Sequence, residues 1–303
     1  VRYSFDSSRA SRDQIFCPRN TQKTRNSGNP NFRICGLSEL TCFGGLVGKT
    51  GATFYPMLTL EQIQNYDRDG FVLVPDVFSA QEISILLDHV YDPRVTDHTW
   101  ASKDAAGEES KLALWSDAGD DAFGAVSTSP RLVNAVRMLL REDIYHWHSK
   151  VILKMPKVGG AWEWHQDYGY CLYPRMMSCM IALDRATREN GCLKVVPGSQ
   201  LLGRLNHGLV GEQSGADQER VQAAVDRLGE VYCEAPAGSA LFFHGNTFHA
   251  SEANLSDKPR RSYICCYNAL SNVPYTETSH GKPVPIKVAA DDAITRFGDK
   301  VAT

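Results

Sequence analysis

The chain has 303 residues, of which 43% are hydrophobic and 22% charged, and its formal net charge at pH 7 is −3. This composition is ordinary for a globular protein and offers no excess of positive charge for binding nucleic acid or an anionic membrane surface. No apolar run approaches the roughly twenty residues needed to span a bilayer, so we expect no membrane span.

The N-terminal part differs in composition from the rest. The first fifty residues contain eight Lys or Arg against three acidic residues, and they are rich in Ser, Asn and Gly. We interpret residues 1–54 as a flexible extension or as an organelle-targeting segment, because acid-poor leaders rich in Arg and Ser direct proteins into organelles. Residues 55–303 are expected to form a single folded domain.

Helix signals come first in that domain. Residues 59–62 (Thr-Leu-Glu-Gln) and 79–82 (Ser-Ala-Gln-Glu) both have the form of a capping box, and each predicts the start of a helix. Between the two helices, residues 71–74 have the apolar, β-branched composition of a strand. A third helix is predicted over residues 129–140, because it opens with Ser-Pro and proline is tolerated at the first helical position.

Strand signals dominate the rest of the domain. Apolar runs bounded by turn residues predict strands over residues 146–155, 176–183, 193–196, 240–243 and 261–268. Residues 203–228 look like an insertion, with a helix over 217–228. Helices followed by many short strands predict a mainly β domain with supporting α-helices, of the double-stranded β-helix or jelly-roll type. The polar tail from residue 271 is expected to wrap the barrel or to lie over its mouth.

Cysteine usage indicates a reducing compartment. The chain has nine cysteines, an odd number, and no Cys-x-x-Cys pair. Several lie in apolar, strand-like runs, which is typical of buried free thiols and not of a disulfide framework. We therefore expect an intracellular, cytoplasmic protein, with organelle targeting by the extension as the alternative.

Two short motifs point to metal chemistry. They are residues 164–167 (Trp-His-Gln-Asp) and residues 249–251 (His-Ala-Ser). His165 and Asp167 are two residues apart, so on a strand their side chains point to the same face. His249, about eighty residues later, would complete a set of two histidines and one carboxylate, which is the ligand pattern of non-haem Fe(II) oxygenases. Such a set leaves positions open for a chelating co-substrate and dioxygen.

A basic side chain follows the second motif. Arg260 lies eleven residues after His249, and a guanidinium group fits a carboxylate bidentately. It is therefore a candidate for holding the far carboxylate of a keto-diacid co-substrate.

These residues together resemble the phytanoyl-CoA dioxygenase family of Fe(II)/2-oxoglutarate oxygenases. The similarity covers roughly residues 57–275 and includes Gly159-Gly160 and the segments 189–193 (Glu-Asn-Gly-Cys-Leu) and 197–199 (Pro-Gly-Ser), in the order and spacing of the family. The resemblance implies a jelly-roll fold, with Fe(II) as the metal and with 2-oxoglutarate and O2 as co-substrates.

The resemblance also assigns roles to individual residues. His165, Asp167 and His249 would bind iron, and Arg260 and Ser251 would bind the C5 carboxylate of 2-oxoglutarate. A smaller set would lie near the co-substrate: Gln166, Lys150 and Met180. The related halogenases have Gly or Ala at the carboxylate position, so the aspartate at position 167 disfavours halogenation.

Two rivals to these assignments occur nearby. His244 precedes His249 by five residues, but the spacing to the serine and arginine favours His249 as the ligand. Arg261 follows Arg260 directly, and on a strand the two side chains face opposite sides, so only one can point into the barrel.

Other polar and aromatic residues have two interpretations each. His146, His148 and Lys150 are expected on one strand face, which either looks into the pocket or is a polar edge. The aromatic residues beside the metal motif either form a substrate wall or simply pack, and they are Trp162, Trp164, Tyr168, Tyr170 and Tyr173. The basic residues that either meet an anionic substrate or are ordinary surface groups are Arg175, Arg204 and His207.

The function predicted from these residues is oxidation, most simply hydroxylation, of a small organic molecule with release of succinate and CO2. The same chemistry can instead give oxidative cyclisation or desaturation, since the placement of the substrate decides the outcome. Two alternatives lie outside this chemistry, a metal enzyme that needs no 2-oxoglutarate and a non-catalytic metal- or ligand-binding barrel. No nucleic-acid partner is expected, and the protein is expected to be a monomer or a homodimer.

Overall fold

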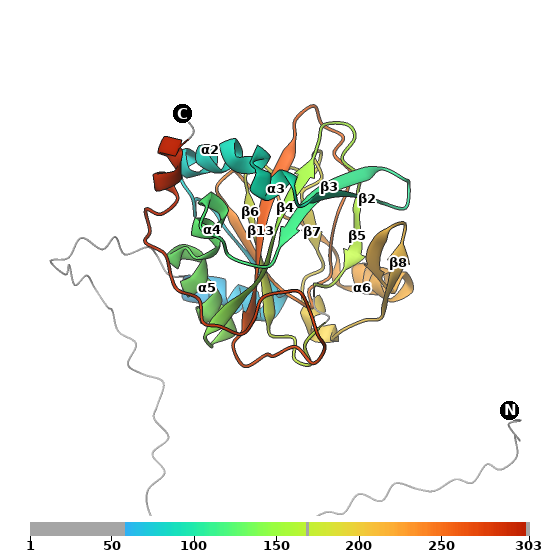
Figure 1. Ribbon diagram of the computed structural model, residues 1–303. Helices are drawn as coiled ribbons and strands as arrows, with labels where there is room; N and C mark the ends of the chain where they lie inside the picture. Colours follow the sequence, from blue (N-terminus) through green and yellow to red (C-terminus); the bar gives the residue numbers. More distant parts are fainter. Residues whose placement is uncertain (1–57, 168–169, 301–303) are drawn as a thin grey trace, which may run out of the picture. The chain divides into compact units, whose positions relative to one another are not determined.

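The computed structural model describes residues 58–167 and 170–300 (Figure 1). The predicted extension over residues 1–54 lies outside the described residues. Within the described ranges, no helix combines the length and apolarity needed to cross a membrane.

Capping side chains begin the helices where the sequence predicts. Thr59 and Ser79 complete capping boxes at the N-termini of α1 and α2, and Ser129 caps α5, whose first residue is proline. Asp217 caps α6 inside the predicted insertion. The structure confirms these predictions. Such signals can be read from the sequence because each involves only neighbouring residues. The α-helices are α1 (Leu60–Asp69), α2 (Ala80–Asp88), α3 (Pro93–Thr96), α4 (Ala122–Ser127), α5 (Pro130–Leu140) and α6 (Gln218–Leu228).

Antiparallel sheets form the centre of the fold, which is the predicted jelly roll. The large sheet has the strand order β1-β11-β6-β13-β4-β3-β2, and the small sheet has the order β10-β7-β12-β5. The strands of the large sheet are β1 (Phe71–Val74), β2 (Thr99–Lys103), β3 (Glu109–Trp115), β4 (Ile144–Lys154), β6 (Met176–Ala182), β11 (Ala240–His244) and β13 (Arg260–Ala269). Those of the small sheet are β5 (Trp162–His165), β7 (Leu193–Val195), β10 (Val231–Tyr232) and β12 (His249–Ser251).

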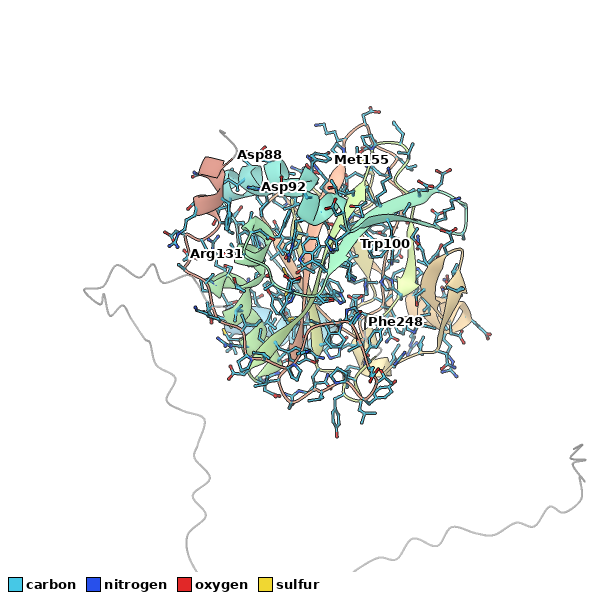
Figure 2. The ribbon with its side chains drawn as sticks, viewed as in Figure 1. Asp88, Asp92, Trp100, Arg131, Met155 and Phe248 are labelled. Carbon is cyan, nitrogen blue, oxygen red and sulfur yellow. The ribbon has the colours of Figure 1, made fainter. Side chains whose placement is uncertain are left out.

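The large sheet is covered on both faces. On β13, Tyr263 and Cys265 belong to the apolar cluster shared with the helices, whereas Ile264 and Cys266 belong to a cluster shared with the small sheet. Figure 1 shows α2, α4 and α5 on one side of the large sheet and β5 and α6 on the other, and Figure 2 shows Arg131 on the helical side. Burial of both faces explains why these strands read as continuous apolar runs in the sequence.

A β-bulge changes the predicted face of β4. The register with β13 pairs His148 with Cys266 and His146 with Tyr267, so Trp147 is an extra residue on β4. As a result His146 turns to the helical side, where its Nε2 lies 2.8 Å from Ser149 Oγ, while His148 and Lys150 stay on the inner face. The prediction that all three residues share one face is therefore wrong for His146, because a bulge shifts the alternation.

The sequence patterns predict neither of two hairpins, and they do not give the detailed course of the C-terminal tail. β2 and β3 extend the large sheet, and β8 (His207–Val210) and β9 (Gln213–Ala216) form a separate hairpin before α6. The C-terminal tail follows β4 and the helices: Gly281 N donates to Trp147 O at 2.7 Å, and Ala289 N donates to Thr128 O at 2.9 Å. The tail thus lies along the barrel edge before the short helix η3 (Thr295–Lys300).

Candidate active site

Strand pairing brings the two sequence motifs together. β12 pairs with β5 so that His249 lies opposite His165, and the two imidazole rings are 4.1 Å apart. Asp167 follows β5, and its backbone N–H donates to Gly245 O at 3.0 Å. Asp167 Oδ1 is 3.9 Å from His165 Nε2, and Oδ2 is 3.8 Å from His249 Nε2. These three side chains offer ligand atoms that all lie within 4.8 Å of one another, close enough to share one metal ion.

Backbone carbonyl groups orient both imidazole rings. His165 Nδ1 lies 2.7 Å from Glu163 O, and His249 Nδ1 lies 2.9 Å from Thr247 O. Because a carbonyl only accepts hydrogen bonds, Nδ1 carries the proton and Nε2 keeps its lone pair for a metal. Burial, reinforced by His249, lowers the pKa of His165 to about 3, so the ring is neutral as a ligand must be.

The carboxylate between the two rings is held in its ionised form. Burial alone would raise the pKa of Asp167, but nearby Lys150 and the two imidazoles bring it well below the ordinary value. Lys150 Nζ is 3.3 Å from Asp167 Oδ1, and Ser178 Oγ donates to Oδ2 at 2.5 Å. Asp167 is therefore fixed in place and negatively charged at neutral pH.

Arg260 is a buried cation without an acidic partner in the part of the chain that the structure describes. Its guanidinium donates to Gly191 O at 2.7 Å and to Ser262 Oγ at 3.1 Å, and only 2% of the residue is exposed. Its Nε has no hydrogen-bond partner, and no acidic side chain of the described residues lies within ion-pair distance. Burial lowers the pKa of Arg260 to about 10, which leaves the group charged at neutral pH.

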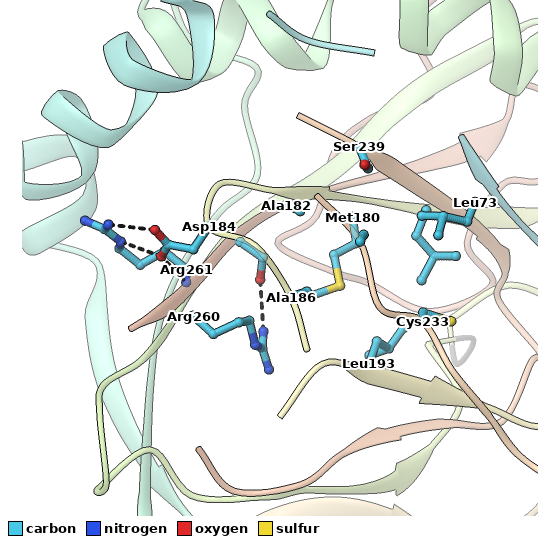
Figure 3. A pocket seen from close by; sticks show the side chains of 13 residues that line it. Leu73, Met180, Ala182, Asp184, Ala186, Leu193, Cys233, Ser239, Arg260 and Arg261 are labelled. Atoms are coloured by element: carbon cyan, nitrogen blue, oxygen red, sulfur yellow. Dashed lines mark hydrogen bonds and ion pairs between the residues drawn. The ribbon is translucent and has the colours of Figure 1, made fainter. Parts of the chain in front are cut away.

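The neighbouring arginine faces away, as the alternation predicts. Figure 3 shows Arg261 turned toward Asp184, while Arg260 points into the barrel. Both contacts between the Arg261 guanidinium and the Asp184 carboxylate are 2.8 Å. Arg261 is thus neutralised locally, and Arg260 is the one of the two that remains available to an anion.

A second buried basic side chain lies beside Arg260 and was not identified from the sequence. Lys154 pairs with Arg260 across β4 and β13, and its side chain is fully buried. Its Nζ donates to Ser251 Oγ at 2.9 Å and to the backbone oxygen of Glu252. Burial and the charge of Arg260 lower the pKa of Lys154 well below its ordinary value. The alternation of Lys150, Ile152 and Lys154 along β4 was a usable signal, because all three face one side.

The two cations and the metal-ligand triad line one pocket. It is lined on its apolar sides by side chains that include Met180, Trp162 and Phe243, and Ser251 contributes a hydroxyl. Two buried cations side by side are unfavourable unless an anion joins them. The pocket therefore combines three side chains that can share a metal ion with two basic side chains that can bind a carboxylate.

Some predicted site residues lie elsewhere. Gln166 faces away from the triad: its Nε2 donates to Gly203 O and Asn246 O, both at 2.8 Å, and its Oε1 accepts from Leu205 N at 2.9 Å. Its amide has a full set of backbone partners, so it fastens the insertion and is not free to bind a co-substrate.

The remaining candidates have other contacts. Arg175 forms an ion pair of 2.8 Å with Glu142 and is not among the residues that line the pocket. His244 Nδ1 accepts from Asn246 N at 3.0 Å and stabilises the turn before β12. Tyr170 packs in an aromatic group near the end of β4, with its ring 6.0 Å from that of Trp147. Tyr168 lies outside the described residues.

Comparisons with known proteins bear on this geometry. The phytanoyl-CoA dioxygenase (PhyH) family matches residues 66–262, a range that contains the triad and Arg260. The chain belongs to the phytanoyl-CoA dioxygenase family. An ectoine dioxygenase from Bordetella bronchiseptica is 29% identical over 243 residues, covering 72% of this chain and 78% of the relative. An L-proline trans-4-hydroxylase from Streptomyces griseoviridis is 27% identical over 256 residues, covering 75% and 91%.

Solved structures share the fold. EctD from S. alaskensis with bound Fe superposes with a TM-score of 0.64 at 24% identity, covering 77% of this chain and 87% of that one. EctD from S. alaskensis with 2-oxoglutarate and 5-hydroxyectoine superposes with a TM-score of 0.61 at 24% identity, covering 75% and 81%. The phytanoyl-CoA dioxygenase family consists of Fe(II)/2-oxoglutarate oxygenases, and this chain is such an enzyme, acting on a small molecule.

The residues present suit the cofactors of the phytanoyl-CoA dioxygenase family. Two neutral imidazoles and one ionised carboxylate match the preference of Fe(II) for nitrogen and oxygen ligands, with coordination positions left over. Arg260 and Lys154, both buried and both without an acidic partner among the described residues, match the negative charge of a dicarboxylate.

Proposed function

We propose that the protein hydroxylates a small organic molecule, with iron held by His165 Nε2, His249 Nε2 and Asp167. The far carboxylate of 2-oxoglutarate is held between Arg260 and Lys154, beside Ser251. The observation that carries this proposal is the pair of buried cations, which has no acidic partner in the described part of the chain and shares its pocket with the triad.

The protein supplies positioning and charge. When bound, iron and 2-oxoglutarate activate O2 so that one oxygen atom enters a C–H bond of the substrate while 2-oxoglutarate becomes succinate and CO2. The carbonyls of Glu163 and Thr247 fix the ligand tautomers of the two histidines, and Lys150 keeps Asp167 ionised. Apolar walls formed by Met180 and Phe243 keep water from the pocket and direct oxidation to the substrate.

The relatives support a proposal for the substrate class. The names of the two curated relatives describe oxygenation of ectoine and of L-proline, which are small, polar, cyclic amino-acid derivatives. We propose a substrate of this size and polarity. Mass spectrometry of the product distinguishes the outcomes, because hydroxylation adds one oxygen atom whereas cyclisation or desaturation removes two hydrogen atoms.

The cofactor assignment is tested without knowing the substrate. Anaerobic addition of Fe(II) and then 2-oxoglutarate to the purified protein is expected to produce a weak metal-to-ligand charge-transfer band in the visible spectrum. Arg260→Gln should weaken 2-oxoglutarate binding at least tenfold, since charge-assisted hydrogen bonds are each worth about 1.5–3 kcal/mol.

Arg261→Gln is the matched control, since Arg261 lies next in sequence and faces Asp184. It should leave the dissociation constant of 2-oxoglutarate unchanged. Equal loss in both variants, or no band from the wild-type protein despite bound iron, would contradict the assignment.

We propose that the protein works in a reducing compartment. Six cysteines of the described residues are buried free thiols, among them Cys179, Cys265 and Cys266. This supports a reducing compartment such as the cytoplasm.

A further inference from the structure

One buried histidine on the inner face of β4 has no hydrogen-bond partner among the residues that the structure describes. His148 is 7% exposed, and neither of its ring nitrogens has a partner within residues 58–167 and 170–300. Buried polar side chains are almost always paired in folded proteins, so an unpaired imidazole calls for an explanation. The cofactor contacts proposed above leave it unused.

The C-terminal tail brings a second histidine to the same place. The ring of His280 lies 4.7 Å from that of His148 and 4.9 Å from that of Trp147, and its Nδ1 is also unpaired within the described ranges. The ring of Tyr170 also packs here, 5.2 Å from that of His280. Two imidazoles with unused nitrogens therefore meet at an aromatic edge of the barrel.

The position of His280 is fixed by the backbone. Gly281 N donates to Trp147 O at 2.7 Å, which joins the tail to the bulge of β4. A Cβ at position 281 would overlap the carbonyl oxygen of His146, so only glycine permits this close approach. The two histidines are therefore brought together by a built contact between tail and strand.

The site is continuous with the metal ligands. Lys150 is the next inward residue on β4 after His148, and its Nζ is 3.3 Å from Asp167. Among the described residues, Asp167 is the sole acidic partner within ion-pair distance of Lys150. A metal ion bound by Asp167 would share the negative charge of that carboxylate. The charge of Lys150 would then be only partly balanced by Asp167, which favours a second anion beside it.

We infer that His148 and His280 form the substrate-binding end of the active site and, with Lys150, bind a carboxylate group of the substrate. Each neutral imidazole offers one N–H donor and the ammonium group offers three, a set that suits a carboxylate better than a neutral acceptor. Trp147 and Tyr170 supply apolar surface for the body of the molecule. The inference rests on the proposed function and extends it, since it names the group by which the substrate is recognised.

The test uses the full chain loaded anaerobically with Fe(II) and 2-oxoglutarate. The probes are amino acids and cyclic amino acids, including L-proline and ectoine, each compared with its carboxamide. Binding is measured as a perturbation of the charge-transfer band. At least one acid should bind, and its amide should bind at least tenfold more weakly.

The variants His148→Phe and His280→Phe keep an aromatic ring but remove its hydrogen bonds. Each should weaken binding of the acid about tenfold or more while leaving the band formed with 2-oxoglutarate alone unchanged. His98→Phe, at an exposed position outside the group of rings around His148, is the matched control and should bind as the wild type does.

Three results would overturn the inference: equal binding of acid and amide, unchanged binding in both phenylalanine variants, or no perturbation by any acid. Failure to form the band with 2-oxoglutarate alone is a separate result. It would overturn the proposed function, and the inference with it.

Discussion

At the scale of single residues, a lysine side chain buried without a carboxylate is unfavourable as an ammonium ion, so its place in the pocket favours an anionic ligand. Lys154 is in this situation, with Ser251 and a backbone carbonyl as its neutral partners and Arg260 as its neighbour. Replacing Lys154 by methionine keeps the length of the side chain and removes the charge.

We expect Lys154→Met to have opposite effects on binding and stability. The dissociation constant of 2-oxoglutarate should rise about tenfold to hundredfold, as for the loss of one charge-assisted hydrogen bond. The thermal midpoint of the protein without ligands should stay the same or rise, because burial and the charge of Arg260 disfavour the protonated lysine when no anion is bound. Spectroscopic titration and thermal unfolding measure the two quantities. Lys157→Met, where the side chain is 59% exposed, is the control. A parallel fall in affinity and stability would instead mean that Lys154 serves the fold.

At the scale of elements, the success of sequence prediction depended on the range of each signal. Thr59 and Ser79 were identified as caps because a capping box involves residues three apart. His165 and Asp167 were placed on one face by strand alternation, but only strand pairing could show that His249 lies opposite His165. The bulge at Trp147 depends on register with a distant strand, so it was not foreseeable, and His146 was placed on the wrong face.

Gln166 offers an element-scale prediction, because the family resemblance and the structure give it different roles. Two of its hydrogen bonds to backbone groups join the end of β5 to the insertion that carries β8, β9 and α6, and the third reaches Asn246 O in the turn before β12. Gln166→Leu should lower the free energy of unfolding by about 2–4 kcal/mol, since it leaves buried backbone groups unpaired. Faster amide hydrogen exchange over residues 203–216 should accompany this loss.

The affinity for 2-oxoglutarate discriminates between the two roles of Gln166. It should change less than twofold if the side chain only fastens the insertion. Gln222→Leu, at an exposed position on α6, is the matched control for stability. A large loss of 2-oxoglutarate affinity with unchanged stability would restore the role implied by the resemblance.

At the scale of the whole molecule, a buried ion-pair network joins segments far apart in the sequence. Arg131 on α5 contacts Glu82 on α2 at 2.5 Å and Asp291 in the C-terminal tail at 2.9 Å. The side chains of Arg131 and Glu82 are only 8% and 6% exposed. This network holds the helices and the tail against the large sheet, on the face opposite the active site.

The network predicts how stability depends on pH. Burial would raise the pKa of Glu82, but hydrogen bonds from Arg131 and from the Ser79 backbone outweigh it and lower the pKa below the ordinary 4.5. A carboxyl group with a lowered pKa in the folded state stabilises that state fully above its unfolded pKa. This stabilisation is lost as the pH falls through the folded pKa. The contribution of Glu82 should therefore be constant from about pH 6 upward and should disappear below pH 4.5.

Glu82→Gln isolates this contribution from those of other acidic groups. The variant should be less stable than the wild type by about 3–5 kcal/mol at pH 7, because Arg131 loses its buried counter-ion. The difference should shrink as the pH falls below 4.5, where Glu82 itself becomes neutral in the wild type. Urea unfolding between pH 3.5 and pH 7 measures this difference in stability.

The control is Asp117→Asn, which removes an ion pair with Arg94 in which the aspartate is 70% exposed. It should change stability by less than about 1 kcal/mol. A difference between Glu82→Gln and the wild type that stays constant over the whole pH range would show that the lost stability comes from packing or capping, and that the charge of Glu82 contributes nothing.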